Sequence, residues 1–168
     1  MNRNSEEKDS VAGVGVGTFE DLTVYQVARD FRKAMYSIAK ELPEIEKFGL
    51  VSQIRRAALS VTNNIAEGHG RFHYLEQIKF MLHSRGSLQE LPDDLNTCED
   101  EQYLSQDRID VLKKHGWRLR QLIDGYVAYL RNKKTEHTKA REDSSYYAGL
   151  ASGPTNYEST SYESTDIE

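Results

Sequence analysis

Apolar residues in the middle of this chain recur every three or four positions in four successive segments, which is the period of an amphipathic α-helix. The first segment ends before Pro43, and the second lies between residues 50 and 67. The third carries its apolar stripe from Leu75 onward, and the fourth follows Ser105. Only three of the 168 residues are proline, and no stretch alternates β-branched with polar residues. The pattern therefore predicts an all-α protein.

The connections between the four segments are short, and Gly68 and Gly70 mark the second of them. Short connections make successive helices antiparallel neighbours. At the start of the first segment, Thr18 and Asp21 have the spacing of a capping box, so we expect the first helix to begin there. The predicted fold is an antiparallel up-and-down four-helix bundle over residues 18–134.

Both ends of the chain differ in composition from this bundle. Residues 1–17 end in VAGVGVG, which is too rich in glycine for a helix, and we interpret them as a flexible leader. Residues 135–168 are rich in Ser, Thr, Tyr and Glu, and contain NYEST followed directly by SYEST at 156–165. Such a segment has too few aliphatic side chains to offset the entropy lost on ordering. We therefore predict a disordered acidic tail.

Charge is distributed unevenly along the chain. The formal net charge is −5, but residues 142–168 hold six acids and no base, so residues 1–141 balance 22 bases against 21 acids. Within that part, residues 86–107 contain seven acids and no base, whereas residues 108–139 contain nine bases and three acids. Segregation of this kind favours head-to-tail association of identical subunits, or a basic surface that binds phosphates.

Three separated motifs give the chain a family resemblance over about residues 18–132. They are FEDLTVYQVARDF at 19–31, LPEIEKFGLVSQIRRAALSVTNNIAEGHGR at 42–71 and GSLQEL at 86–91. In these motifs the chain resembles the four-helix bundle family named for intervening sequences in 23S ribosomal RNA genes. The accessory variability proteins of diversity-generating retroelements look like relatives within the same group.

The resemblance implies a homo-oligomer, namely a homopentameric ring or barrel, and it does not imply an enzyme. For the retroelement relatives it implies a basic ring that binds a reverse transcriptase and nucleic acid. Our first hypothesis is therefore a non-enzymatic, homo-oligomeric scaffold that binds RNA or DNA, a ribonucleoprotein partner, or both. The basic side chains expected to contact phosphates or a partner are Arg55, Arg56, Arg71, Lys79, Lys113, Lys114, Arg118 and Arg120.

The second segment also carries a polar stripe beside its apolar one. Side chains three or four residues apart on a helix can touch in series, so Glu67 can pair with Arg71. One interpretation is a network of hydrogen bonds and ion pairs that fixes helix packing or subunit register, and the other is a binding surface. The residues assigned to this structural motif are Asn63, Asn64, Glu67, Gly68 and Gly70.

Two other functions stay open. One is a pure protein-interaction scaffold whose basic faces meet an acidic protein. The other is a ribonuclease, because Arg108 and His115 are separated by six residues and resemble the Arg-x4–6-His element of HEPN ribonucleases. We interpret Trp117 and Tyr126 as core or interface anchors rather than as platforms for base stacking.

Several classes are disfavoured by composition. No window of 18 apolar residues exists, which argues against a membrane span and favours a soluble, cytoplasmic protein. Cys98 is the only cysteine, so neither an intrachain disulfide nor a thiolate cluster can form. His69, His73 and Glu76 have a spacing that could offer metal ligands, but His69 lies between two glycines. We expect no metal and no cofactor.

Overall fold

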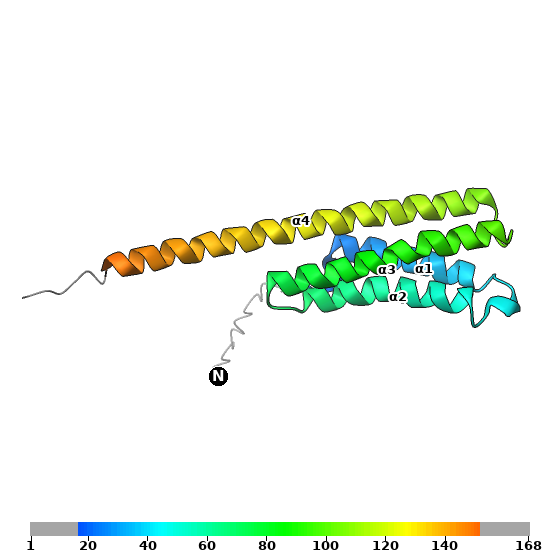
Figure 1. Cartoon of the computed structure of the whole chain (residues 1–168), viewed down its shortest axis with the longest axis horizontal. Helices are drawn as coiled ribbons and strands as arrows, with labels where there is room; N and C mark the ends of the chain where they lie inside the picture. Colours follow the sequence, from blue (N-terminus) through cyan, green and yellow to red (C-terminus); the bar gives the residue numbers. More distant parts are fainter. Residues whose placement is uncertain (1–16, 152–168) are drawn as a thin grey trace, which may run out of the picture.

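The computed structural model describes residues 17–151, and these residues fold into an all-α structure (Figure 1). Four helices account for most of them, and no strand is present within this range. The helices are α1 (Thr23–Ala39), α2 (Leu50–His69), α3 (Tyr74–Asp100) and α4 (Gln106–Ala151), with short 3₁₀ helices η1 (Phe19–Asp21) and η2 (Glu44–Glu46). The predicted fold class is confirmed.

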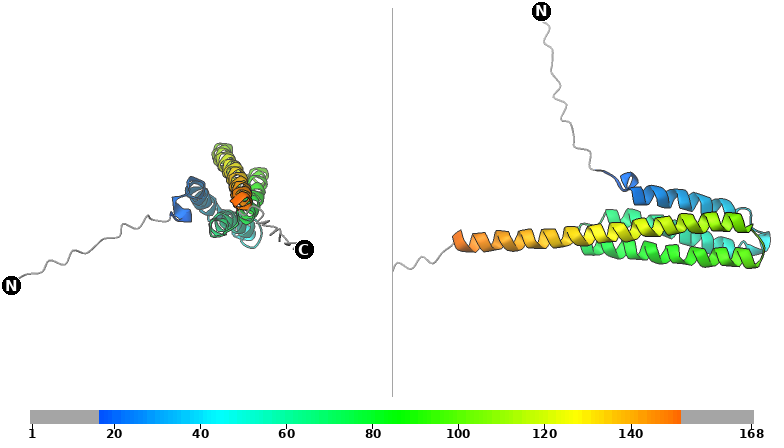
Figure 2. Two further views of the ribbon diagram at one scale, coloured as in Figure 1. Left: turned by 90° about the vertical axis from the view of Figure 1, so that its left-hand side faces the viewer. Right: turned by 90° about the horizontal axis from the view of Figure 1, so that it is seen from above.

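Contacts between neighbouring helices show that they run antiparallel. Between α2 and α3, Arg56 pairs with Glu90 and Ser60 hydrogen-bonds to Ser87, so positions rise along one helix as they fall along the other. Helix α4 returns alongside α3 and also contacts α1, where Phe31 packs against His115. The bundle is therefore closed, as the end-on view in Figure 2 shows.

The start of the first helix differs from the prediction. Thr18 and Asp21 do form a capping box, but the box caps the short helix η1. Leu22 then adopts an extended conformation, with φ −71° and ψ 123°, and α1 begins only at Thr23. The extended residue ends η1 because its backbone angles are incompatible with a continuous helix.

The predicted apolar stripes supply the core of the bundle. Phe31, Met35, Ile54, Leu91 and Leu119 are among the fully buried side chains, and each helix contributes at least one of them. The predicted stripe of the third helix is not buried at its first residue. Leu75 is exposed, because it lies in the first turn of α3, at the end of the bundle.

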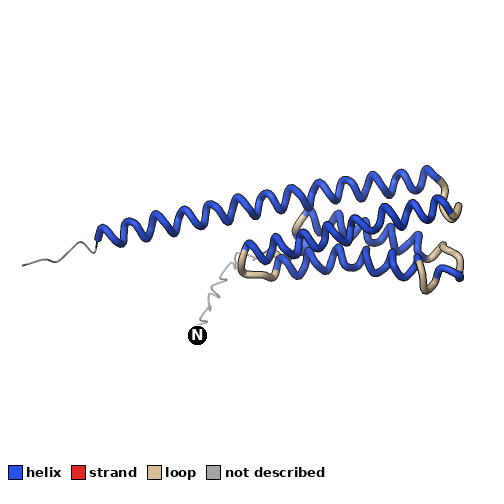
Figure 3. Tube along the Cα trace, in the orientation of Figure 1, coloured by secondary structure: helices blue, strands red, loops and turns tan. Residues whose placement is uncertain are grey.

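Helix α4 continues well past the predicted end of the bundle. Its last buried residue is Leu130, yet the helix runs on to Ala151 and projects from the bundle as a single rod (Figures 1 and 3). The expected disorder from residue 135 is thus not what the structure shows for residues 135–151. The helix continues from the last turn of the bundle, and local pairs such as Lys133 with Glu136 support it without burial. The leader up to residue 16 and the NYEST and SYEST repeats lie outside the described residues.

Candidate nucleic-acid interface

Half of the eight predicted basic residues form ion pairs within the chain. These pairs are Arg56 with Glu90, Arg71 with Glu67, Lys113 with Glu99, and Arg120 with Asp124. Two of them join different helices, since Arg56 binds a carboxylate of α3 from α2 and Lys113 binds one from α4. Positive charge that is neutralised in this way is less available to phosphates. The Arg56 side chain is nevertheless 62% exposed, and a role of Arg56 and Lys113 in binding phosphates stays a prediction.

Arg120 belongs to a cluster that ties α4 to α3. Asp124 accepts hydrogen bonds from Arg85 of α3 at 3.0 Å and from Arg120 at 3.4 Å. Arg120 also donates to the side-chain oxygen of Gln89 at 2.8 Å. Burial alone would raise the pKa of Asp124, but the two guanidinium groups outweigh it and hold the pKa below its usual value. This cluster stabilises the packing of the two helices.

Lys114 and Arg118 lie on the outward face of α4, on either side of Trp117. Both cations are exposed, and neither has an ion-pair partner within residues 17–151. The Trp117 side chain is 63% exposed, so it is not a core anchor, and its role at an interface stays a prediction. Tyr126, in contrast, is half-buried against the core. A surface that combines an exposed indole with unpaired cations can bind either single-stranded nucleic acid or another protein.

The two remaining predicted cations differ in their surroundings. Lys79 is exposed on α3 and has no ion-pair partner in the described part of the chain. Arg55 lies over the ring of Tyr36, with its guanidinium carbon 4.8 Å from the ring centroid. This contact holds the guanidinium against α1 and leaves its charge exposed.

The polar stripe of α2 forms a hydrogen-bonded seam against α3. The Asn64 amide donates to the backbone carbonyl of Ser60 at 2.8 Å and to its hydroxyl at 3.1 Å. The Ser60 hydroxyl in turn meets that of Ser87 at 2.8 Å, and buried Ser84 donates to the Val61 carbonyl. These contacts match the structural interpretation of the stripe.

The two glycines of the motif, Gly68 and Gly70, differ in whether the structure has room for a side chain. Gly68 is buried in the last turn of α2, and a Cβ at that position would lie 2.9 Å from the Cβ of Phe80 on α3. That separation is too short for two carbon atoms, so the close approach of the helices requires glycine. At Gly70 the nearest atom would be 3.6 Å away, and its φ of −74° suits any residue.

We expect Gly68→Ala to lower the free energy of unfolding by about 1–2 kcal/mol, because overpacking outweighs the gain in helix propensity. Gly70→Ala is the matched control, and we expect it to leave stability unchanged or to raise it by up to about 1 kcal/mol. Urea denaturation followed by circular dichroism measures both. Equal effects of the two substitutions would contradict the tight contact at Phe80.

Arg71 closes the turn that follows α2. Its guanidinium pairs with Glu67, as predicted, and lies over the Phe80 ring with 4.7 Å from its carbon to the ring centroid. Gln77 donates to the Arg71 backbone carbonyl at 2.8 Å. Arg71 is therefore held by contacts on the same side of the molecule as Gly68, which makes it a structural residue in this fold.

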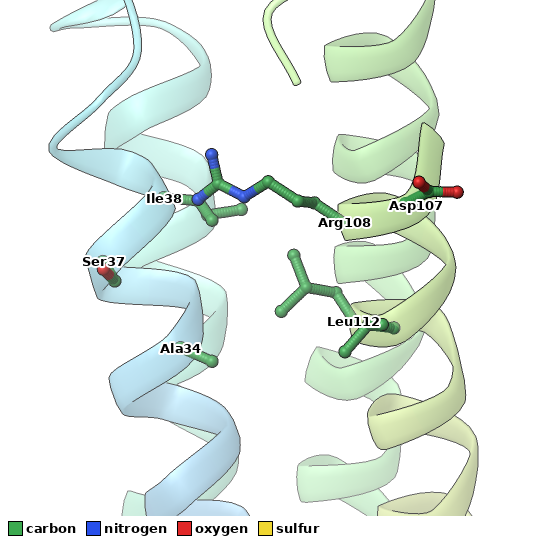
Figure 4. A pocket seen from close by; sticks show the side chains of 7 residues that line it. Ala34, Ser37, Ile38, Asp107, Arg108 and Leu112 are labelled. Carbon is green, nitrogen blue, oxygen red and sulfur yellow. The ribbon is translucent and has the colours of Figure 1, made fainter. Parts of the chain in front are cut away.

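The two residues expected for a ribonuclease each make a packing contact between α4 and the first helical segment or the turn after it. Arg108 donates two hydrogen bonds to Glu41, at 2.7 and 2.9 Å, and these hydrogen bonds hold the pKa of Glu41 below its usual value. Arg108 borders a groove of about 430 Å³, shown in Figure 4, where its side chain reaches from α4 towards α1. His115 does not line this groove.

His115 instead packs edge-on against Phe31, with 5.2 Å between ring centroids. Burial lowers the pKa of its imidazole, Arg118 lowers it further, and Asp30 partly opposes this. His115 thus packs α4 against α1, and Arg108 ties α4 to the turn after α1. The structure does not favour the ribonuclease hypothesis.

The remaining chemistry-bearing residues are dispersed. Within residues 17–151 no three His, Cys, Asp or Glu side chains gather as a metal site would need. Burial, followed by the charges of Asp94 and Glu46, raises the pKa of the Cys98 thiol to about 11, so it is a poor nucleophile. Across the same range, no helix offers an apolar stretch of the length that crossing a bilayer requires.

Comparison with known proteins gives a family match that covers most of the bundle. A family model described as 23S rRNA-intervening sequence protein matches residues 20–125, which is more than half of the chain. The chain belongs to this family. The description of the family refers to RNA and names no enzymatic activity. A search of curated proteins found no significant match.

In this member of the 23S rRNA-intervening sequence family, the fold brings together one further group that the sequence did not reveal. The projecting part of α4, which lies beyond the matched residues, overhangs the turn between α2 and α3. Lys134, His137 and Arg141 there line one cleft together with Phe72. The signal in the sequence is the spacing of these three residues, which continues the buried stripe of α4 from Leu130.

Proposed function

We propose that the protein is a non-enzymatic, homo-oligomeric scaffold that binds nucleic acid through the outward face of α4. The observation that supports this most directly is the position of Lys114 and Arg118. Most of the other predicted cations are used in contacts inside the bundle, whereas these two are exposed beside Trp117. The RNA context in the description of the family supports the same assignment.

Binding of this kind depends on charge rather than on base sequence. Lysine and arginine contacts to phosphates release condensed counterions, so affinity falls steeply as salt rises. Contacts to phosphate position a protein on the nucleic acid but do not read its bases. We therefore expect weak sequence preference and strong salt sensitivity.

The charge reversal Lys114→Glu with Arg118→Glu tests this surface. We expect it to weaken retention of RNA about tenfold or more at low salt, and to reduce the slope of log K against log salt by about 1.5 for two lost phosphate contacts. Fluorescence anisotropy with a labelled RNA, titrated at several salt concentrations, measures both quantities.

Arg29→Glu with Lys40→Glu is the matched control, since it changes the net charge equally at two exposed cations of α1 and its C-terminal end. Loss of binding in both double variants would mean that net charge alone matters. Salt-independent binding, or no binding by the unmodified protein at any salt, would refute the proposal.

Self-association fits the distribution of charge and of apolar surface. The groove beside Arg108 is lined by Ala34, Ile38 and Leu112, and Val111 at its edge is exposed. A second copy that covers this groove would bury that surface, and its acidic segment 86–107 complements a basic α4. The subunit number implied by the family resemblance is five.

The exposed apolar side chains also favour a second candidate, a scaffold that binds only protein. A reverse transcriptase would be one such partner, on the resemblance to retroelement proteins. Co-purification with and without nuclease separates the two candidates, because a partner held by protein contacts stays bound after nuclease treatment.

A further inference from the structure

The core-facing side of α4 changes from apolar to polar and cationic where the bundle ends. Within the bundle this side is apolar and buried, and past Leu130 the same spacing of three and four residues places polar and cationic side chains on it. The buried members are Ile123, Val127 and Leu130, and their continuations are Lys134, His137 and Arg141. A basic strip therefore overhangs the end of the bundle.

Beneath the overhang lies an aromatic wall formed by the turn between α2 and α3. The Phe72 side chain is 90% exposed, and its ring meets that of His73 with 5.1 Å between centroids. Tyr74 is half-buried at the start of α3, and its ring lies 6.4 Å from that of His137 across the gap. The two walls enclose a cleft of about 470 Å³.

The charged side chains that line the cleft are cationic. Lys134 and Arg141 line it, and neither has an ion-pair partner within residues 17–151. None of the described residues that line it is a carboxylate. Cations on one wall and an open aromatic face on the other suit a ligand that carries both phosphates and flat rings.

We infer that this cleft binds single-stranded nucleic acid, with a base stacked on Phe72 and phosphates held by Lys134 and Arg141. The inference rests on the proposed function and adds a site to it. The cleft has the size of ordinary ligand pockets. A duplex cannot use the Phe72 ring in the same way, because its bases are already stacked and paired.

An acidic peptide would satisfy the two cations but would leave the aromatic face without a matching group. The exposed phenylalanine is therefore the feature that favours a nucleic acid, since every base offers a π-face for stacking. Single-stranded RNA and DNA share this chemistry, so both serve as probes.

Fluorescence anisotropy on the full chain with 12-nucleotide oligo(U) and oligo(dT) tests the site. We expect Phe72→Ala to weaken binding about tenfold, the loss of one stacking contact, and Phe72→Trp to restore it. Lys134→Glu with Arg141→Glu should weaken binding at least as much and reduce the salt dependence. A 12-base-pair RNA duplex should be insensitive to Phe72→Ala.

Matched controls exist for both changes. Phe48 is 89% exposed at the opposite end of the bundle, so Phe48→Ala removes an equally exposed ring. Arg131→Glu with Lys139→Glu makes the same charge change on α4 at residues that do not line the cleft. We expect both controls to weaken binding less than the cleft variants do. All variants should keep the oligomer mass of the unmodified protein.

The outcomes separate this inference from the proposed function. Binding that is lost in the Lys114 and Arg118 double variant but unaffected by Phe72→Ala would overturn the inference alone. Equal losses for duplex and single strand, or competition by poly-glutamate that also depends on Phe72, would overturn it as well. No binding of any oligonucleotide by the unmodified protein would refute the proposed function itself.

Discussion

Replacement of Phe31 by alanine is expected to lower the free energy of unfolding by about 3–5 kcal/mol. Phe31 lies fully buried on α1, and its ring fills the space between that helix and α4. A Cβ at Gly116 on α4 would lie 3.3 Å from the Phe31 ring, so the two helices approach closely at this point. Removing the ring leaves a cavity that these closely packed helices cannot easily fill.

Trp117→Ala is the matched control for this prediction, since it also removes a large aromatic ring from the same region. The indole is 63% exposed, so we expect a change within about 1 kcal/mol. Its effect should appear instead in RNA binding or in oligomer mass. Urea denaturation measures stability, and a cost below about 1 kcal/mol for Phe31→Ala would contradict the packing of α1 on α4.

Asp94→Asn is expected to make the protein more stable at neutral pH. The Asp94 side chain is buried on α3, and its Oδ2 atom has no hydrogen-bond partner among the described residues. Burial, together with the neighbouring charges of Glu90 and Asp93, raises the pKa of this carboxyl to about 6, although Arg56 partly opposes them. The charged form is therefore disfavoured in the folded state.

The direction of the pH dependence follows from this raised pKa. In the unfolded chain an aspartate has a pKa of about 3.9, so between about pH 4 and 6 the native state binds more protons than the unfolded state. The contribution of Asp94 to stability consequently falls as pH rises through this interval. The difference between the two pKa values of Asp94 corresponds to at most about 3 kcal/mol of stability.

We expect Asp94→Asn to raise the free energy of unfolding by about 1–3 kcal/mol at pH 7 and to have little effect at pH 4. The measurement is the difference between variant and unmodified protein, because Asp124, whose pKa is lowered, acts in the opposite direction in both. Asp100→Asn is the control, because Asp100 is exposed on the same helix and does not contribute to the raised pKa of Asp94. A destabilised Asp94→Asn variant at pH 7 would show that the carboxylate has a favourable partner.

Local patterns predicted most of the fold. The spacing of apolar residues fixes which side of each helix is buried, so the stripes containing Phe31, Ile54, Leu91 and Leu119 correctly identify the core. The pairing of Glu67 with Arg71 is also predictable, because the two residues lie one helical turn apart. Composition predicted disorder at residues 135–151, whereas the structure has a helix there. Once the bundle has nucleated α4, adding further residues to the helix costs little free energy.

The candidate site depended far more on tertiary structure. A count of charges cannot show that Arg56 pairs with Glu90 or Arg108 with Glu41, because those partners lie far apart in the sequence. Within the described residues, Lys114 and Arg118 are exposed next to Trp117 and take no part in such pairs.

The sequence by itself determined the helical class, the four stripes and the overall segregation of charge, all of which depend on neighbours within a few turns. Only the tertiary structure decided which cations are neutralised and which stay exposed. It also placed the basic end of α4 over Phe72, because the direction in which a helix leaves the bundle is set by packing against the other three.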